Sequence, residues 1–239
     1  MKRRHFLKFL GALPLLGTLP GLARAQHTGE QMPGMTPPPG GKRNIAVLYY
    51  DMALMYDYAP AAEIFRVAGH SSLFSLYSVA ASREAIPAMF PRQIFADYTF
   101  EDAPVPEVII IPGGDWMAMR ERTAEFDWLK SCQDQGAILF SVCTGGYVLA
   151  VGGFLDGIKV AGLQSQLEIL EKLAPKAEVQ SGLAFVDAGN IVTAAGAATS
   201  LDCSLHLVRR LTDYETARWV AQDYLDHFAW RPDFRGQPG

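Results

Sequence analysis

A single cysteine stands at the point where an apolar segment of the sequence gives way to a helical one. Residues 137–142 (AILFSV) are apolar almost throughout and are typical of a short buried strand, whereas residues 147–150 (YVLA) are typical of a buried helical turn. The two glycines before the helical turn permit a close approach of two backbones. We therefore expect Cys143 to stand above the sheet at the start of a helix, where unpaired N–H groups stabilise a thiolate.

Such a strand–turn–helix junction is the nucleophile elbow of esterases, with cysteine in place of serine. A second interpretation is that Cys143 is a small buried hydrophobic residue, as most free cysteines are. The other cysteines are Cys132 and Cys203, and an odd number leaves at least one thiol unpaired in an oxidising compartment. No Cys-x-x-Cys or Cys/His spacing is present, so we expect no metal and no cofactor.

The strands and helices that must position this cysteine alternate along the chain from Asn44 onward. We predict strands at residues 45–50, 74–80, 108–111 and 137–142, helices at 59–69, 123–135, 164–173, 199–211 and 214–228, and a hairpin turn at 187–190. Pro60 suits the first turn of the first helix, where a missing N–H costs nothing. The alternation predicts an α/β fold in which a mostly parallel sheet lies between layers of helices.

Three connections that follow predicted strands carry residues able to do chemistry. They are residues 51–57, 112–116 and 143–146. Ligand sites in parallel α/β folds gather at the carboxyl ends of the strands. We therefore expect the three connections to share one rim of the sheet.

The N-terminus carries the features of a bacterial export signal. Residues 1–25 contain a twin-arginine pair (Arg3 and Arg4), a modestly apolar stretch and an Ala-x-Ala cleavage site. The apolar stretch is too short and too broken for a stable membrane span, although a retained anchor is an alternative. Residues 26–41 are rich in Pro and Gly and are typical of a flexible linker. We expect a periplasmic protein with one domain at residues 42–239 and no membrane association after signal cleavage.

The predicted mature chain is acidic. Loss of the export signal removes five basic residues and no acidic ones, which leaves 16 Lys and Arg against 25 Asp and Glu, a net charge of −9. An acidic domain without a basic stripe argues against nucleic acid as a partner. We expect the partner to be a small molecule that serves as substrate or ligand.

Three stretches, in this order, resemble the ThiJ/PfpI superfamily. They are MYDYAPAAEIF (55–65), VIIIPGGDW (108–116) and SVCTGGYVLA (141–150), and residues 189–208 are similar to the late hairpin and helix of that superfamily. The resemblance covers residues 44–212 and is closest to the isonitrile hydratase-like branch, which has Cys-Thr-Gly at its elbow and an Asp in the first loop. It implies a flavodoxin-like three-layer sandwich, a fold shared with class I glutamine amidotransferases. It also implies a possible homodimer, because members of the ThiJ/PfpI superfamily are commonly dimeric.

The resemblance implies that Cys143 is the nucleophile and that Asp57 hydrogen-bonds it from the first strand–helix connection. A carboxylate and a thiolate repel each other in one site, so one of the two pKa values should rise. A protonated Asp57 then donates a hydrogen bond to the thiolate and later delivers a proton. The alternative for Asp57 is that it caps the first helix or lies in solvent.

The same resemblance implies supporting roles around the pair. Glu63 matches a second acid on the first helix. The backbone N–H groups of Gly114 and Thr144 match an oxyanion-type hole, with Gly113 beside it. Simpler alternatives stay open: Glu63 serves the helix dipole, the two glycines only end a strand, and Thr144 is only a helix-start residue.

One departure from the family pattern bears on activity. Many relatives carry a histidine shortly after the elbow helix, and Leu163 stands at that position, so a Cys–His dyad is unavailable there. His206 lies four residues after Asp202 on a predicted helix, and the ordinary interpretation is a helix residue without a catalytic role.

Two functions of different classes remain open. The first is an exported cysteine-dependent enzyme of the isonitrile hydratase type, a C–N lyase, in which Cys143 attacks the terminal isonitrile carbon and Asp57 acts as acid and base. The second is a non-catalytic periplasmic protein that binds a ligand or senses redox state through its thiol. Leu163 in place of a histidine favours the second, and turnover of isonitriles separates the two.

Overall fold

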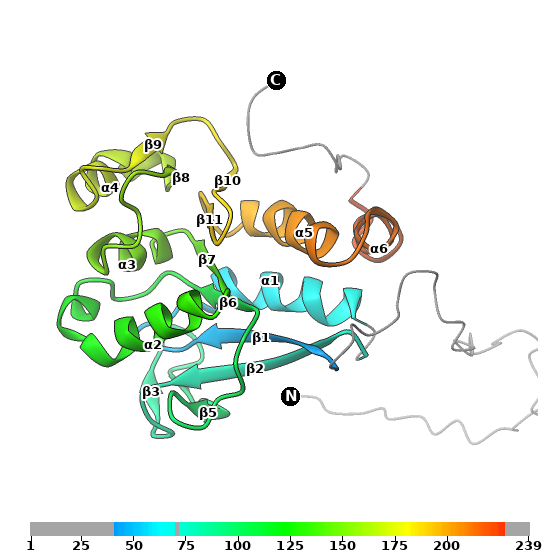
Figure 1. The fold of residues 1–239 in the computed structure, drawn as a ribbon, viewed down its shortest axis with the longest axis horizontal. Helices are drawn as coiled ribbons and strands as arrows, with labels where there is room; N and C mark the ends of the chain where they lie inside the picture. The colour runs from blue at the N-terminus through cyan, green and yellow to red at the C-terminus, as the bar shows by residue number, and fades with distance from the viewer. Residues whose placement is uncertain (1–40, 70–71, 228–239) are drawn as a thin grey trace, which may run out of the picture. The chain divides into compact units, whose positions relative to one another are not determined.

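A computed structural model describes residues 41–69 and 72–227 of the chain (Figure 1). The export signal predicted at residues 1–25 lies outside the described residues, and so does the linker predicted at residues 26–41, except for Gly41. No helix within the described ranges is long and apolar enough to span a membrane.

Seven strands form the central sheet, in the spatial order β10-β11-β7-β6-β1-β2-β5. They are β1 (Arg43–Leu48), β2 (Phe74–Ala80), β5 (Tyr98–Thr99), β6 (Val108–Ile111), β7 (Ile138–Val142), β10 (Phe185–Asp187) and β11 (Ile191–Ala194). Every neighbouring pair is parallel except β10 and β11, which form an antiparallel hairpin at one edge. The mostly parallel sheet and the late hairpin expected from the sequence are both confirmed.

Helices cover both faces of this sheet, which confirms the expected α/β sandwich. They are α1 (Met55–Ala68), α2 (Thr123–Asp134), α3 (Gly145–Val151), α4 (Leu167–Leu173), α5 (Thr199–Leu211) and α6 (Tyr214–Trp219), with 3-10 turns η1 (Ala118–Glu121) and η2 (Gln164–Gln166) and a π-helical turn η3 (Val220–Tyr224). On one face α1 packs against α5. On the other, α2 and α3 share a hydrophobic cluster with β1, β6 and β7 (Figure 1).

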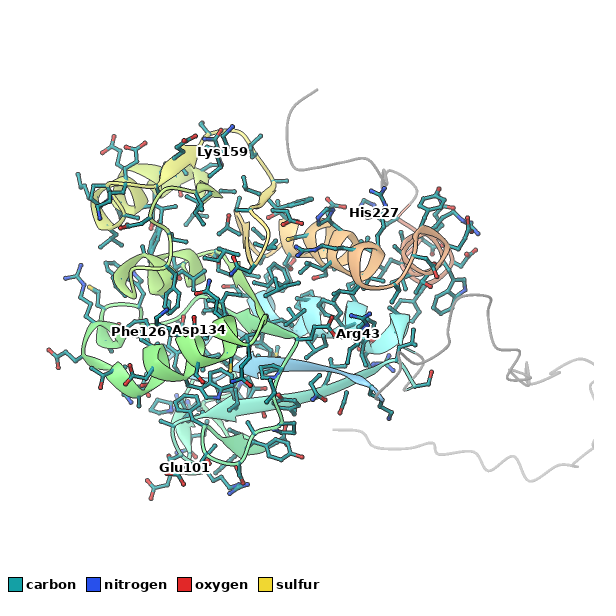
Figure 2. All side chains as sticks on the ribbon, viewed as in Figure 1. Arg43, Glu101, Phe126, Asp134, Lys159 and His227 are labelled. Carbon is teal, nitrogen blue, oxygen red and sulfur yellow. The ribbon has the colours of Figure 1, made fainter. Side chains whose placement is uncertain are left out.

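Side chains of the sheet and of the helices fill both interfaces (Figure 2), and this double coverage explains the apolar runs in the sequence. Every residue of β6 and β7 is buried, including Ser141. Strands with one face in water alternate between apolar and polar residues, whereas strands covered on both faces do not. The buried strands predicted at residues 108–111 and 137–142 are therefore confirmed.

Five short strands have no counterpart in the sequence prediction. β3 (Ile86–Pro87) and β4 (Gln93–Ile94) form a small hairpin, β8 (Lys159–Ala161) pairs in parallel with β9 (Glu178–Gln180), and β5 lies at the sheet edge. Each has only two or three residues. An alternating pattern cannot be recognised over so few positions.

The first helix begins at Met55, four residues ahead of its predicted start. Pro60 therefore lies inside the helix, and the prediction that it occupies the first turn is wrong. The N–H of Leu54 is donated to the carbonyl oxygen of Gly113 at 2.8 Å, and the N–H of Asp57 to that of Leu54 at 3.0 Å. Because this contact with a neighbouring loop starts the helix ahead of the proline, Asp57 lies in the first turn of α1 rather than in a loop.

Candidate active site

Cys143 stands on the connection between β7 and α3, as the elbow interpretation predicts. Its backbone φ is +57°, in the left-handed region that residues with a side chain rarely adopt. The N–H of Cys143 is donated to the carbonyl oxygen of Ala194 at 3.1 Å, and its own carbonyl oxygen accepts the N–H of Gly146 at 3.2 Å. Such a conformation costs about 1–2 kcal/mol and persists only where its surroundings enforce it.

Gly145 allows the elbow to pack against the end of β6. A Cβ atom at this position would lie 2.1 Å from the carbonyl oxygen of Ile111 and 2.8 Å from that of Pro112. No side chain fits there, which confirms the close backbone approach expected from the sequence. Gly146 has no such constraint: outside the helix backbone and its chain neighbours, the described residue that a Cβ atom there would meet is Ser141, whose hydroxyl oxygen is 3.8 Å away.

Asp57 occupies a closed space beside the elbow. The residue is 2% exposed, and its Oδ2 accepts the N–H of Gly113 at 2.8 Å. A Cβ atom at Gly113 would lie 2.5 Å from that oxygen and 2.6 Å from Oγ1 of Thr144, so the glycine makes room for the carboxyl group next to the elbow. These contacts do not fit Asp57 as a helix cap or as a solvent-exposed residue.

The environment of the Asp57 carboxyl group favours its protonated form. Burial raises the pKa of Asp57 to about 6, and the hydrogen bond from Gly113 opposes this shift only in part. The groups that act on this pKa include no cation from the described part of the chain. The carboxyl group therefore exchanges its proton close to neutral pH, the range in which an acid–base catalyst works.

The three thiols of the chain lie in different environments. All are free; Cys132 and Cys203 are buried, and Cys143 is partly exposed. Burial raises the pKa of Cys132 to about 11 and holds that of Cys203 well above its usual range. Burial, and then the charge of Asp57, also raise the pKa of Cys143. The N–H of Thr144 opposes both but does not outweigh them, so the stabilised thiolate expected from the sequence is not borne out. Protonation of Asp57 removes the second cause, so the titrations of the two groups are coupled.

The N–H groups expected to form an oxyanion-type hole have acceptors in the structure. The N–H of Gly114 points to Oγ1 of Thr144 at 3.4 Å, and that of Gly113 is donated to Asp57. The N–H of Thr144 acts on the sulfur of Cys143. An oxyanion hole here would require Gly114 to give up its long hydrogen bond. Thr144 contributes its hydroxyl group to the site as well as its backbone.

Tyr50 is a site residue that the sequence pattern does not single out. Its hydroxyl donates to the carbonyl oxygen of Pro112 at 2.6 Å, and a Cβ atom at Gly114 would lie 2.7 Å from its ring. Burial holds the pKa of Tyr50 well above its usual range, and the charges of Asp57 and Cys143 add to the shift. Tyr50 ends an apolar run, so the pattern assigns it to the strand and hides its polar end.

Glu63 has partners away from the elbow. Its carboxylate accepts hydrogen bonds from Arg66 on the same helix at 2.5 and 2.6 Å, and from the hydroxyl of Tyr224 at 2.7 Å. These partners favour the simpler interpretation, in which Glu63 is a helix-surface acid.

The partners of His206 belong to the β10–β11 hairpin rather than to the Cys143–Asp57 pair. Nε2 of His206 lies 2.7 Å from Oδ2 of Asp187, and Arg210 donates to the same carboxylate at 3.0 Å. His206 therefore ties α5 to the β10–β11 hairpin. Leu163 immediately precedes η2 and brings no ionisable group to that position.

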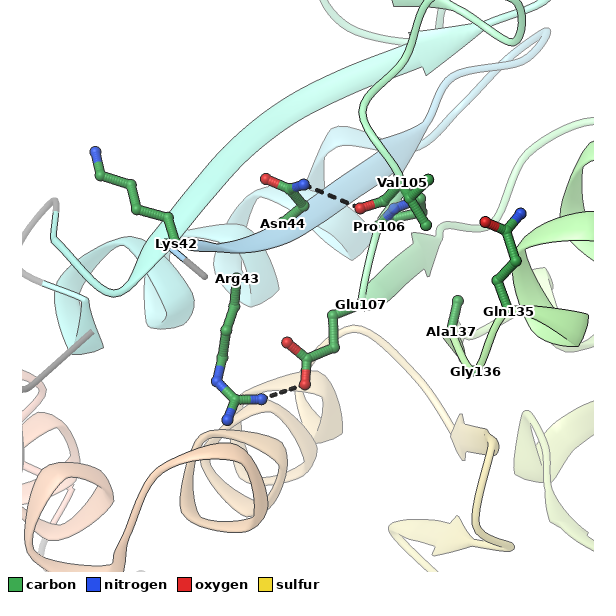
Figure 3. A pocket seen from close by; sticks show the side chains of 10 residues that line it. Lys42, Arg43, Asn44, Val105, Pro106, Glu107, Gln135, Gly136 and Ala137 are labelled. Atoms are coloured by element: carbon green, nitrogen blue, oxygen red, sulfur yellow. Dashed lines mark hydrogen bonds and ion pairs between the residues drawn. The ribbon is translucent and has the colours of Figure 1, made fainter. Parts of the chain in front are cut away.

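A cavity of about 380 Å³ lies at the opposite end of the sheet from Cys143 (Figure 3). It is lined by residues at or just before the starts of β1, β6 and β7, where Arg43 forms an ion pair with Glu107 and Asn44 donates to the carbonyl oxygen of Val105. No group of three or more His, Cys, Asp or Glu residues in the described ranges is placed to hold a metal ion. The chemistry-bearing residues gather around Cys143, so we locate the candidate active site there.

A flavodoxin-like α/β sandwich with a cysteine on an elbow at the carboxyl ends of its strands defines the class of this protein. The chain belongs to the DJ-1/PfpI family, whose sequence profile matches residues 43–210. The family membership confirms the resemblance to the ThiJ/PfpI superfamily.

Three relatives illustrate the proteins that contain this domain. The chain is 31% identical over 141 residues to isonitrile hydratase of Pseudomonas putida, covering 59% of this chain and 60% of the hydratase. It is 25% identical over 196 residues to the HTH-type transcriptional regulator GbdR of Pseudomonas aeruginosa, covering 81% of this chain and 53% of the regulator. A ThiJ/PfpI family protein from Pseudomonas syringae superposes with a TM-score of 0.69 at 25% identity, over 87% of this chain and 86% of that one. The chain thus spans only a little over half the length of the hydratase and of the regulator.

Proposed function

We propose that this protein is a cysteine-dependent enzyme that hydrates an isonitrile to a formamide, with Cys143 as nucleophile and Asp57 as acid and base. The observation that carries the proposal is the buried carboxyl group beside a partly exposed thiol, with the pKa of Asp57 raised to about 6. The 31% identity to the isonitrile hydratase of Pseudomonas putida supports the substrate class.

The first half of the reaction needs a nucleophile and a proton source at the same carbon atom. The Cys143 thiolate forms a C–S bond to the terminal carbon of R–N≡C, and that carbon takes the proton of Asp57. The product is a thioimidate, R–N=CH–S–Cys, beside an ionised Asp57.

The second half adds water and releases the product. Ionised Asp57 removes a proton from water as the water oxygen bonds to the thioimidate carbon, and the nitrogen then takes that proton from Asp57. Asp57 accepts the remaining hydroxyl proton as the C–S bond breaks. The products are R–NH–CHO, the thiolate and a protonated Asp57, so the cycle closes without any other reactant.

The N–H groups of the turn at Gly113 and Gly114 suit this reaction better than acyl transfer. Hydrolysis of an amide or ester places negative charge on an oxygen atom and requires free N–H donors aimed at it. Addition to an isonitrile places charge on the carbon next to sulfur, where a proton removes it. Here the two N–H groups are already donated to Asp57 and Thr144, and a protonated acid is at hand.

Turnover of isonitriles by the wild-type protein and two variants tests the proposal. Asp57→Asn still accepts the N–H of Gly113 but delivers no proton, so turnover should fall by about 10²-fold or more. Glu107→Gln removes a carboxylate at the other end of the sheet and should leave turnover unchanged. Wild-type protein that leaves a panel of aliphatic and aromatic isonitriles intact would contradict the proposal.

The similarity to regulators such as GbdR supports a second function, in which the Cys143 site binds a ligand without turnover. Leu163 in place of a histidine fits this alternative. Asp57→Asn should then leave the affinity for the isonitrile panel within about a few-fold of wild type, because no proton moves. Calorimetric titration of both proteins, alongside the turnover assay, separates the two functions.

The twin-arginine pair at Arg3 and Arg4 supports export of the folded protein to the periplasm. Replacement of both residues by Lys should retain the precursor in the cytoplasm, which fractionation and immunoblotting measure. Mature protein in the periplasm in normal amounts would show that export does not depend on this pair.

A further inference from the structure

A smaller cavity, of about 130 Å³, lies at the carboxyl ends of β1 and β2, where α2 begins. Its walls come from residues 49–51, which follow β1, from residues within 80–87, which run from the end of β2 into β3, and from Arg122 and Glu125. Ligand sites in parallel α/β sheets gather at this end of the strands. A cavity of about 150 Å³ holds one benzene molecule, so this one has room for a ligand of about six non-hydrogen atoms.

The charge of this cavity is negative. Its walls include the carboxylates of Asp51, Glu84 and Glu125. Arg122 is the one cation among the described residues that line it, so three carboxylates and one guanidinium leave a net charge of −2. That guanidinium donates to Oδ2 of Asp51 at 2.6 Å. The cavity therefore has more acceptors than its own residues satisfy.

Glu125 is the carboxylate that most needs a partner. Its side chain is only 5% exposed, yet no described residue donates a hydrogen bond to it. Its ion-pair partner, Nη1 of Arg122, lies 3.7 Å away, which is beyond hydrogen-bond distance. Glu125 is the third residue of α2, where the positive end of the helix dipole favours a negative charge. Burial of a carboxylate without donors is costly, and the N–H groups of a bound ligand would supply the missing hydrogen bonds.

The walls of the cavity define the chemistry of that ligand. The net negative charge favours a cation, and the lack of donors to Glu125 favours one that carries N–H groups. A metal ion fits less well, because no group of three or more His, Cys, Asp or Glu within residues 41–69 and 72–227 is placed to hold one. An alkyl group suits the remaining wall, whose apolar members are Ala80, Ala81, Ala85, Ile86 and Pro87.

We propose that this cavity binds a small protonated primary amine, whose ammonium group donates hydrogen bonds to Glu125 and whose alkyl chain lies against the apolar wall. Neither Cys143 nor Asp57 lines the cavity. The site is therefore distinct from the candidate active site, and the inference does not rest on the proposed function.

Three probes with the same number of non-hydrogen atoms test the assignment on the full chain labelled with 15N. n-Butylammonium has a charge, N–H donors and an alkyl chain, tetramethylammonium has the charge without N–H groups, and 1-butanol has no charge. Butylammonium should bind saturably with a Kd of about 1 mM and should shift the amide signals of the cavity walls most. The other two should bind at least about 10-fold more weakly, because each lacks a charge-assisted hydrogen bond to Glu125.

Three variants locate the effect. Glu125→Gln keeps the shape of the side chain but removes its charge, and should weaken butylammonium binding by about 10-fold or more. Glu121→Gln is the matched control, because it removes the same charge from an exposed residue that does not line the cavity. Its affinity should stay within about 2-fold of wild type. Arg122→Gln removes the competing cation and should tighten binding by about 3-fold.

Each outcome decides the assignment. Selective binding of butylammonium that is weakened in Glu125→Gln and kept in Glu121→Gln supports it. Wild-type protein that does not bind butylammonium saturably overturns it, and so do equal affinities for the three probes or signal shifts centred away from the cavity. An unchanged affinity in Glu125→Gln, or an equal loss in both glutamate variants, also overturns it. If Glu125→Gln fails to fold, the comparison of the probes in the wild type and the direction of the change in Arg122→Gln decide the assignment.

Discussion

The two ends of the central sheet differ in whether a charged group has an oppositely charged partner, and in whether the backbone is strained. At the carboxyl end, Asp57 is buried with no cation of the described residues acting on it, and Cys143 adopts a left-handed conformation. At the amino end, Arg43 and Glu107 form an ion pair whose side chains are 25% and 35% exposed. The cavity of Figure 3 belongs to the amino end, yet the groups with unfavourable environments belong to the carboxyl end. Strain and uncompensated burial therefore locate the reactive site better than cavity volume does.

The largest effect that distinguishes the two ends should come from Cys143→Ala. Loss of the nucleophile should lower isonitrile hydration by more than about 10³-fold, whereas Arg43→Gln at the amino end should leave it unchanged. Initial rates of formamide production, measured by chromatography, give both values. Residual activity of Cys143→Ala near the wild-type level would exclude a covalent role for this thiol.

Two glycine substitutions compare the packing of the two ends. Gly145→Ala places a Cβ atom 2.1 Å from the carbonyl oxygen of Ile111, and we expect a loss of about 3 kcal/mol or more in the free energy of unfolding. Gly136→Ala at the amino end places a Cβ atom with no other atom of the described residues within 4 Å, apart from its chain neighbours, but retains a φ of +97°, and should lose about 1 kcal/mol. Urea denaturation measures both losses. Equal losses would mean that the elbow relaxes to admit a side chain.

Asp57→Asn should stabilise the protein in a pH-dependent way. The pKa of Asp57 is about 6 in the folded protein against a usual 3.8, so the folded state binds the proton more tightly than the unfolded state does. Ionisation of Asp57 therefore costs stability as the pH rises from 3.8 to about 6, and this cost persists above that range. The variant should exceed the wild type by about 3 kcal/mol at neutral pH, and by much less near pH 4.

Urea denaturation at the two pH values measures the effect of Asp57→Asn, with Glu107→Gln as control. The control breaks a partly exposed ion pair, so it should lose about 0–1 kcal/mol at neutral pH rather than gain stability. A gain for Asp57→Asn that is the same at both pH values would show that the carboxyl group has an ordinary pKa.

The smallest effect concerns the thiol itself. The carboxylate of Asp57 is the second cause that raises the pKa of Cys143, after burial. Asp57→Asn removes that charge, so the thiolate should form at lower pH, with a shift below about one unit because burial remains. The ultraviolet absorbance of the thiolate follows this titration, with Cys143→Ala as the blank. A Cys143 pKa that rises in Asp57→Asn would contradict the coupling of the two groups.

The longer strands and the elbow could be predicted from the sequence because local patterns determine them. The limits of β2, β6 and α5 agree with the sequence prediction at every residue, since each is a clear periodic or apolar run between turn residues. The cysteine between the buried strand and the small helix follows from the same local reasoning. Five strands of two or three residues carry too little pattern to be predicted.

The arrangement within the site could not be predicted in the same way, because it depends on contacts between segments far apart in the chain. The start of α1 depends on the hydrogen bond from Leu54 to Gly113, and the burial of Asp57 depends on the same turn. The sequence also does not reveal that Tyr50 supports this turn through Pro112, or that Glu63 finds its partner in Tyr224. Residue type and order predict which residues are able to react, and tertiary contacts decide how they are placed.

Titration of the Asp57 carboxyl carbon by NMR tests the central claim most directly, namely that an acid beside Cys143 holds its proton close to neutral pH. The signal is assigned in protein labelled with 13C at its aspartate carboxyl groups, by its loss in Asp57→Asn. The account predicts a midpoint at a pH of about 6, which persists in Cys143→Ala because burial is the main cause of the raised pKa. A midpoint near 3.8, the usual value for an aspartate, would contradict it.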